Sequence, residues 1–189
     1  MSIKEKLQGD LNTAIRGRDE VSSSTIRMLL TAITNEEVAR AAGVTLQQVI
    51  ESGDENSAMA LMAQGASALS MQLHRAGRID GLLALGGTMG TDLALDVASS
   101  LPLGVPKVVL STVAFSPLLP PARMPPDLMM VLWAGGLYGL NSLCQSALAQ
   151  AAGAVVGACR LARRADFSRG SRCPSTRSTR SRRASSKRI

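Results

Sequence analysis

The sequence predicts an α/β protein in which helices flank a small parallel sheet. Short apolar runs bounded by glycine or proline alternate along the chain with longer segments of helical periodicity. A Gly-rich segment at 86–91 lies directly between one such run and a helical segment. Strands that alternate with helices form layered sheets of parallel strands, so both observations favour this fold class.

The strands are expected at 79–85, 107–112 and 128–133. Runs that are apolar almost throughout, rather than alternating, are typical of parallel strands buried on both faces. The segment 91–100 predicts a helix between the first two strands, and an Ala-rich helix from about 139 to 162 follows the third.

Residues 2–38 predict an α-helical hairpin ahead of the sheet. Ser2 and Glu5 have the spacing of a capping box, and apolar residues recur at helical intervals in both arms. Such a hairpin exposes an apolar stripe and is not stable alone. A further helix is expected from Asn56 to Gly77, with the glycine as its C-terminal cap.

The net charge of +7 belongs to the C-terminus. Eleven of the 21 Lys and Arg residues lie at 160–189, where Asp166 is the single acid, and residues 1–159 carry ten basic and thirteen acidic side chains. Residues 164–189 predict a disordered Ser/Arg-rich tail. The tail could contact nucleic acid through charge alone, and its composition is also typical of GC-rich DNA translated in a shifted frame.

Cysteine and histidine usage bears on location and on metals. Cys144, Cys159 and Cys173 form no CxxC pair and no signal-peptide pattern opens the chain, so we expect a cytoplasmic protein. His74 is the single histidine, so no metal site is predicted.

The uncharged segment 128–159 raises the question of a membrane span. Polar residues interrupt it, and we therefore expect no stretch long enough to cross a bilayer and no membrane partner. Gly153 and Gly157 form a GxxxG spacing, which also lets a soluble helix approach a sheet closely.

The Gly-rich segment is the candidate site. Glycines permit positive φ and close approach of the backbone to a ligand, and successive N–H groups at a helix N-terminus bind anions. Thr88 and Thr91 could add hydroxyl donors or cap the helix. Ser111 and Thr112 end the neighbouring strand at the same carboxyl edge, where ligands of open α/β sheets bind. The predicted ligand is a nucleotide or similar phosphate compound, at Gly86, Gly87, Thr88, Met89, Gly90, Thr91, Ser111 and Thr112.

This segment is neither a GxGxxG fingerprint nor a P-loop with its lysine. A purely structural strand-to-helix turn is the alternative interpretation. Four acidic residues could do acid–base work, but nothing in the sequence pairs them, and no Ser-His-Asp arrangement can be assigned; no reaction is predicted. These acidic residues are Asp80, Asp92, Asp96 and Asp127.

Residues 1–39, from MSIKEKLQGDLNTAIRGRDE to NEEVA, resemble the opening helices of the GatB/YqeY-type domain. The resemblance implies a link to tRNA-dependent amidotransferases, with glutamine as amido donor and tRNA as partner. The helices that complete such a domain do not follow.

Residues 40–163 resemble the Tm-one-like ATP-binding family, through HRAGRIDGLLALGGTMGTDLAL, LPLGVPKVVLST and GLNSL with LAQAAGAVVG. This resemblance implies a partial Rossmann-like sheet and ATP or a related nucleotide at the Gly-rich turn. The commoner form of the turn is GGSGGT, so Met89 puts a bulky side chain where that family often has glycine.

Together the two resemblances describe a chimera joined near Ala39 and Arg40, with parts at 1–39, 40–163 and 164–189. They imply an ATP-binding module whose activity is unknown, with an amidotransferase-linked protein and a non-functional fusion product as alternatives. A partial sheet leaves unpaired edges, which invite association or aggregation, so the protein is expected to be poorly soluble or to form a homo-oligomer.

Overall fold

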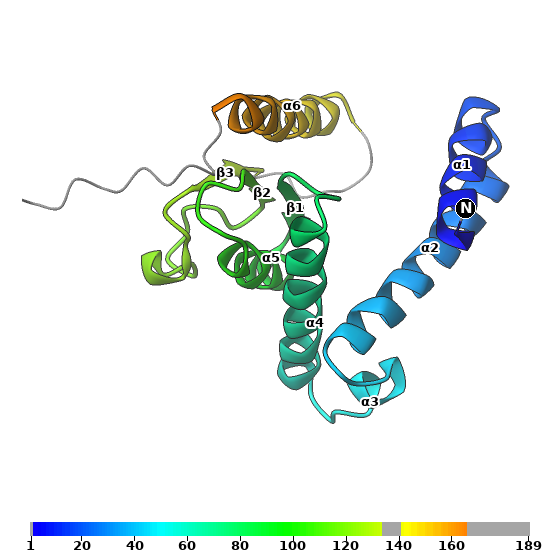
Figure 1. Cartoon of the computed structure of the whole chain (residues 1–189), viewed down its shortest axis with the longest axis horizontal. Coiled ribbons are helices and arrows are strands. Elements are labelled where there is room, and N and C mark those ends of the chain that lie inside the picture. The colour runs from blue at the N-terminus through cyan, green and yellow to red at the C-terminus, as the bar shows by residue number, and fades with distance from the viewer. Residues whose placement is uncertain (1, 134–140, 166–189) are drawn as a thin grey trace, which may run out of the picture.

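A computed structural model describes residues 2–133 and 141–165 as a mixed α/β fold, and Figure 1 shows helices on both faces of a small sheet. The predicted fold class is confirmed at this level. The tail at 166–189 and the first residues of the predicted long helix lie outside the described residues. The elements in chain order are α1 (Ile3–Arg16), α2 (Glu20–Ala41), α3 (Leu46–Ile50), α4 (Glu55–Arg75), β1 (Leu82–Gly86), α5 (Thr88–Ser100), β2 (Lys107–Ser111), η1 (Pro121–Arg123), β3 (Leu128–Leu132) and α6 (Ser142–Ala165).

The sheet has three parallel strands in the order β1-β2-β3. Lys107 opens β2 and is in register with Leu82 on one side and Leu128 on the other. All five residues of β2 are buried because it has a neighbour on each side, whereas the edge strands β1 and β3 are partly exposed. The three predicted strands are therefore confirmed, with β1 shifted toward the Gly-rich turn.

One part of the core lies between the sheet and α6. Val108 and Leu110 of β2 are buried against Ala151 of α6, and Leu148 and Val155 pack around them. On the opposite face of the sheet lies α5, which α4 covers in turn (Figure 1). The sheet is thus sandwiched, and its carboxyl edge meets the N-terminus of α5.

The N-terminal hairpin is also confirmed. Ser2 and Glu5 form the predicted capping box, and α1 has no buried residue. Near its C-terminal end α2 packs on α4: Val38 and Ala39 are buried. A Cβ on Gly65 of α4 would lie 2.0 Å from the Val38 carbonyl oxygen, so only glycine fits there.

The structure corrects two expectations about α6. The helix is continuous from Ser142 to Arg163, and by length and composition it could cross a membrane, so its polar residues do not shorten the run below span length. A single such helix also occurs in soluble proteins, and the described part has the form of a soluble α/β domain. A Cβ on Gly153 or Gly157 would meet nothing within 4 Å, so this pair does not bring α6 close to the sheet.

Candidate functional site

The Gly-rich segment forms a tight connection from β1 into α5. The helix begins at Thr88, three residues earlier than predicted, and its N-cap is Gly87 with φ −79° and ψ −154°. No side chain caps it, so neither Thr88 nor Thr91 has the capping role considered above. The N–H groups of residues 88–90 lie in the first helical turn, where they have no intrahelical acceptor.

Close packing, rather than positive φ, explains the first glycine of the segment. No residue at 86–91 has a positive φ, so that part of the expectation is wrong. A Cβ on Gly86 would lie 2.5 Å from the carbonyl carbon of Gly90 and 2.7 Å from the nitrogen of Thr91. Gly86 therefore lets the end of β1 touch the first turn of α5.

A buried pair of hydroxyl groups ties the turn to β2. The Thr91 and Ser111 hydroxyl oxygens lie 2.7 Å apart, and both residues are fully buried. The Ser111 hydroxyl oxygen also accepts a hydrogen bond from the Val113 N–H at 3.1 Å. These two hydroxyls face each other inside the protein and join the start of α5 to the end of β2.

Thr112 lies on the outer side of this pair. Its N–H donates to the Gly86 carbonyl oxygen at 3.1 Å, and its side chain is partly exposed. Its hydroxyl oxygen would lie 3.7 Å from a Cβ placed on Gly87. The Thr112 hydroxyl therefore lies beside Gly87, the N-cap of a helix that no side chain caps.

The eight predicted ligand residues fall into two groups. Five are exposed or partly exposed around the start of α5, namely Gly87, Thr88, Met89, Gly90 and Thr112, and three are buried, namely Gly86, Thr91 and Ser111. Met89 lines a cavity of about 260 Å³ between α4 and α5. Contact of any of the eight with a ligand stays a prediction.

The acidic residues that had no visible partner in the sequence do have partners in the fold. Arg123 of η1 reaches both Asp92 (2.6 Å) and Asp96 (2.7 Å) of α5. Its hydrogen bond to Asp96 and the two negative charges raise the pKa of the Arg123 guanidinium, against the effect of partial burial. Asp80 pairs with Arg163 of α6. These carboxylates are committed to ion pairs, and within residues 2–133 and 141–165 no three potential ligands gather around a metal position.

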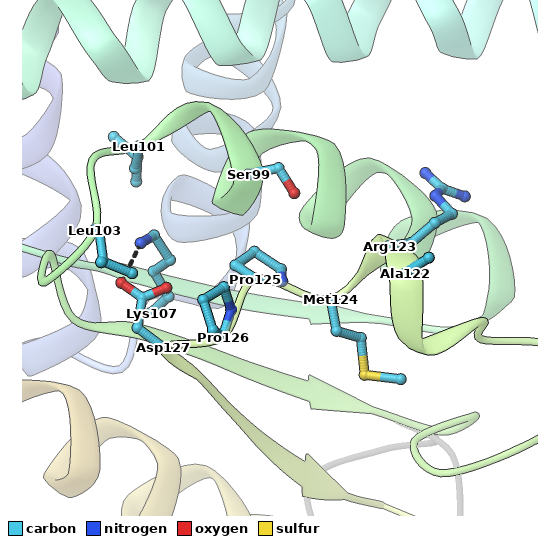
Figure 2. Close-up of a pocket in the computed structure, with 10 residues that line it drawn as sticks. All are labelled: Ser99, Leu101, Leu103, Lys107, Ala122, Arg123, Met124, Pro125, Pro126 and Asp127. Atoms are coloured by element: carbon cyan, nitrogen blue, oxygen red, sulfur yellow. Dashed lines mark hydrogen bonds and ion pairs between the residues drawn. The ribbon is translucent and has the colours of Figure 1, made fainter. Parts of the chain in front are cut away.

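Asp127 pairs with Lys107 at the opposite, amino edge of the sheet (Figure 2). The Lys107 side chain is 1% exposed. Its ammonium group donates to the Asp127 carboxylate at 2.6 Å and to the Pro102 carbonyl oxygen at 2.9 Å. Burial raises the pKa of Asp127, but hydrogen bonds from Lys107 and the Gly104 N–H outweigh it and hold the pKa below its ordinary value.

A cavity of about 330 Å³ adjoins this pair. The second carboxylate oxygen of Asp127 is buried and accepts no hydrogen bond from the described residues. Sequence reasoning missed Lys107, although a signal existed: a lysine opens one strand and an aspartate directly precedes the next, so parallel pairing brings them together.

Comparison with known proteins decides the family. Residues 19–164 match the N-terminal domain of an uncharacterised protein family, UPF0261. The chain belongs to the UPF0261 family. UPF0261 proteins of Brucella suis and Brucella melitensis are 64% and 63% identical to it over 130 residues, which cover 69% of this chain and 31% of each relative. A UPF0261 protein of Clostridium tetani is 32% identical over 125 residues, covering 66% of this chain and 31% of the relative.

UPF0261 membership corrects both resemblances. The Tm-one-like and GatB/YqeY-type assignments were wrong, and the ATP-binding and amidotransferase functions that rested on them fall with them. The family match runs across residues 39 and 40 without a break, and α2 continues through the same point, which overturns the chimera drawn from the two resemblances. The division into three parts stays a prediction.

The chain spans about a third of the length of the UPF0261 relatives it matches. The activity, substrates and partners of those longer proteins are therefore not assigned to this chain by the match.

Proposed function

We propose that this chain binds a small phosphate-bearing molecule at the turn between β1 and α5. The observation that carries the proposal is the uncapped start of α5: Gly87 supplies no side-chain acceptor, and the N–H groups of residues 88–90 face a partly open surface. The N-terminus of a helix carries partial positive charge, so it favours an anion at this position.

Two further features support this location. The turn lies at the carboxyl edge of a parallel sheet, where open α/β folds bind ligands. Thr112 adds a hydroxyl beside Gly87, which can donate to a phosphate oxygen. Gly86, Thr91 and Ser111 have a positioning role in this account, since all three are buried.

The proposal includes a partial Rossmann-like arrangement of this sheet and a cytoplasmic location. Parallel strands with α5 and α6 on opposite faces support the first. Cys144 and Cys159 are both free thiols, which suits a reducing compartment.

Two substitutions at the N-cap test the proposal. Gly87→Asp places a carboxylate where the anion would bind, and an N-cap aspartate also stabilises a helix relative to glycine by a few tenths of a kcal/mol. Gly87→Ala adds a Cβ in ordinary contact and no charge, so it serves as the matched control.

Thermal unfolding is then measured at constant ionic strength with chloride, inorganic phosphate, pyrophosphate and a nucleoside triphosphate. We expect the phosphate compounds to raise the melting temperature of the wild type and of Gly87→Ala but not of Gly87→Asp. An equal response in all three proteins, or none in any, contradicts the proposal. The order of the phosphate compounds identifies how many phosphate groups the site accepts.

A further inference from the structure

Strand β1 has an open edge with apolar side chains beside it. It pairs with β2 on one side only, and no other described strand lies on its other side. Leu83 and Leu85 are 38% and 45% exposed. They are in register with Val108 and Leu110 of β2, whose side chains lie on the α6 face of the sheet, so the two leucines lie on that face as well. One helix does not cover all three strands, so these two leucines remain in contact with solvent.

The direction of the backbone groups in β1 follows from its hydrogen bonds. The Leu82 N–H donates to the Pro106 carbonyl oxygen, and the Gly86 carbonyl oxygen accepts from the Thr112 N–H, so both residues point toward β2. Backbone groups alternate in direction along a strand, so the peptide groups of Leu83 and Leu85 point away from β2. The exposed apolar side chains and the unpaired backbone groups therefore belong to the same two residues.

Nothing in the strand protects this edge. The sequence Leu82–Gly86 has no charge, no proline and no bulge, which are the features that usually keep sheet edges from pairing. The opposite edge differs, since Pro125, Pro126 and Asp127 directly precede β3. Of the two edges, β1 is thus the one prepared for a further strand.

We propose that β1 pairs with β1 of a second copy of this chain, antiparallel and centred on Ala84. A two-fold axis at Ala84 places Leu83 opposite Leu85 of the second copy, and the outward N–H and C=O groups of these residues then bond each other. The apolar side chains meet on the α6 face, and Gly86 leaves room opposite Leu82. The two sheets become one of six strands, a size typical of globular proteins.

A second copy fits this edge because the uncharged side chains of β1 suit pairing with themselves. Leucine lies opposite leucine in both halves, and no charge is left facing its own kind. The inference does not depend on the phosphate site, because the turn at Gly87 lies at the carboxyl end of β1 beyond the paired residues.

Matched lysine substitutions on the two edge strands provide the first test. Leu83 and Met129 lie in the same row of the sheet and are each 38% exposed, so Leu83→Lys and Met129→Lys introduce the same charge on opposite edges. Molar mass is measured by light scattering over a range of protein concentrations. We expect the wild type and Met129→Lys to reach twice the chain mass of 19.8 kDa. Leu83→Lys should stay at the mass of a single chain.

A wild type that stays monomeric overturns the proposal, and so does a dimer that both lysine variants retain. Circular dichroism checks that Leu83→Lys is folded. If it is not, crosslinking decides: mild oxidation of Ala84→Cys should link two chains across the axis, since directly opposed residues approach to about 5 Å. The wild type and Met130→Cys, which lies in the same row on β3, give the background. No excess crosslinking of Ala84→Cys over that background also refutes the interface.

Discussion

Gly86 lies where the last residue of β1 meets the first turn of α5. Its close contacts with the backbone of Gly90 and Thr91 leave no room for a side chain, whereas Gly87 next to it has room for one. The two neighbouring glycines thus have different reasons to be glycine: the first permits close packing, and the second leaves the helix start uncapped.

This difference predicts the effect of alanine at each position. Gly86→Ala forces β1 and α5 apart and should lower the free energy of unfolding by roughly 1–3 kcal/mol, as overpacking in a core does. Gly87→Ala should cost less than about 1 kcal/mol, the scale of N-cap changes. Urea unfolding followed by circular dichroism measures both, and equal losses would show that the packing at Gly86 is not as close as described.

At the scale of elements, the pair of Lys107 and Asp127 fastens the start of β2 to the start of β3. Removing one partner of a buried ion pair leaves an uncompensated charge and costs about 3 kcal/mol or more. The pair lies at the amino edge of the sheet and the candidate phosphate site at the carboxyl edge. Loss of the pair should therefore lower stability without changing phosphate binding directly.

This pair predicts a pH dependence of stability. The pKa of Asp127 is lower in the folded protein than in the unfolded chain, so its contribution is present above the unfolded value and is lost as the pH falls through the folded one. We expect the free energy of unfolding to decrease below about pH 4. Asp127→Asn should lower stability at pH 7 and weaken this acid dependence.

Asp10→Asn provides the control, because Asp10 is exposed on α1 and has no ion pair among the described residues. Denaturant unfolding between pH 3 and pH 7 compares the three proteins. If the free energy of unfolding falls equally with pH in Asp127→Asn and the wild type, the ion pair is not the cause of the acid dependence.

The strands could be predicted from sequence because each is a short apolar run between turn residues, and burial on both faces requires such a run. The start of α5 could not. The sequence placed the start of this helix at residue 91 and left open whether Thr88 or Thr91 caps it. In the structure Gly87 is the N-cap, so Thr88, Met89 and Gly90 belong to the first turn. A glycine has no side chain that could form a capping hydrogen bond, so the sequence gives no signal that it is the N-cap.

The candidate site was predictable as a location but not in its detail. Ser111 and Thr112 were expected together at the carboxyl edge. The sequence does not distinguish them, whereas the structure shows that Ser111 is buried and Thr112 is partly exposed. The ion pairs of Arg123 join segments 27 and 31 residues apart. Pairs of this kind depend on tertiary packing, which no local pattern encodes.

At the scale of the whole molecule, stability is unevenly distributed. Figure 1 shows the α1–α2 hairpin standing away from the sheet, and α1 has no buried residue. The sheet is centred on β2, which is buried throughout. The family match begins at residue 19, at the start of α2, so α1 lies outside the matched region.

We therefore expect hydrogen exchange to be fastest in α1 and slowest in β2, since local opening follows the density of buried contacts. Removal of residues 1–18 should leave exchange in β1, β2 and β3 unchanged and accelerate it only in α2. Mass spectrometry of peptic fragments measures this. Faster exchange throughout the sheet after the deletion would show that α1 stabilises the whole fold.

The central claim, that the start of α5 binds phosphate, is tested most directly by a phosphate titration followed by ¹⁵N–¹H NMR. The account predicts saturable shifts of the Thr88, Met89 and Gly90 amide signals that are larger than those elsewhere, and their loss in Gly87→Asp. Amide signals of residues 88–90 that stay in place while phosphate is added, or that shift equally in Gly87→Asp, would contradict it.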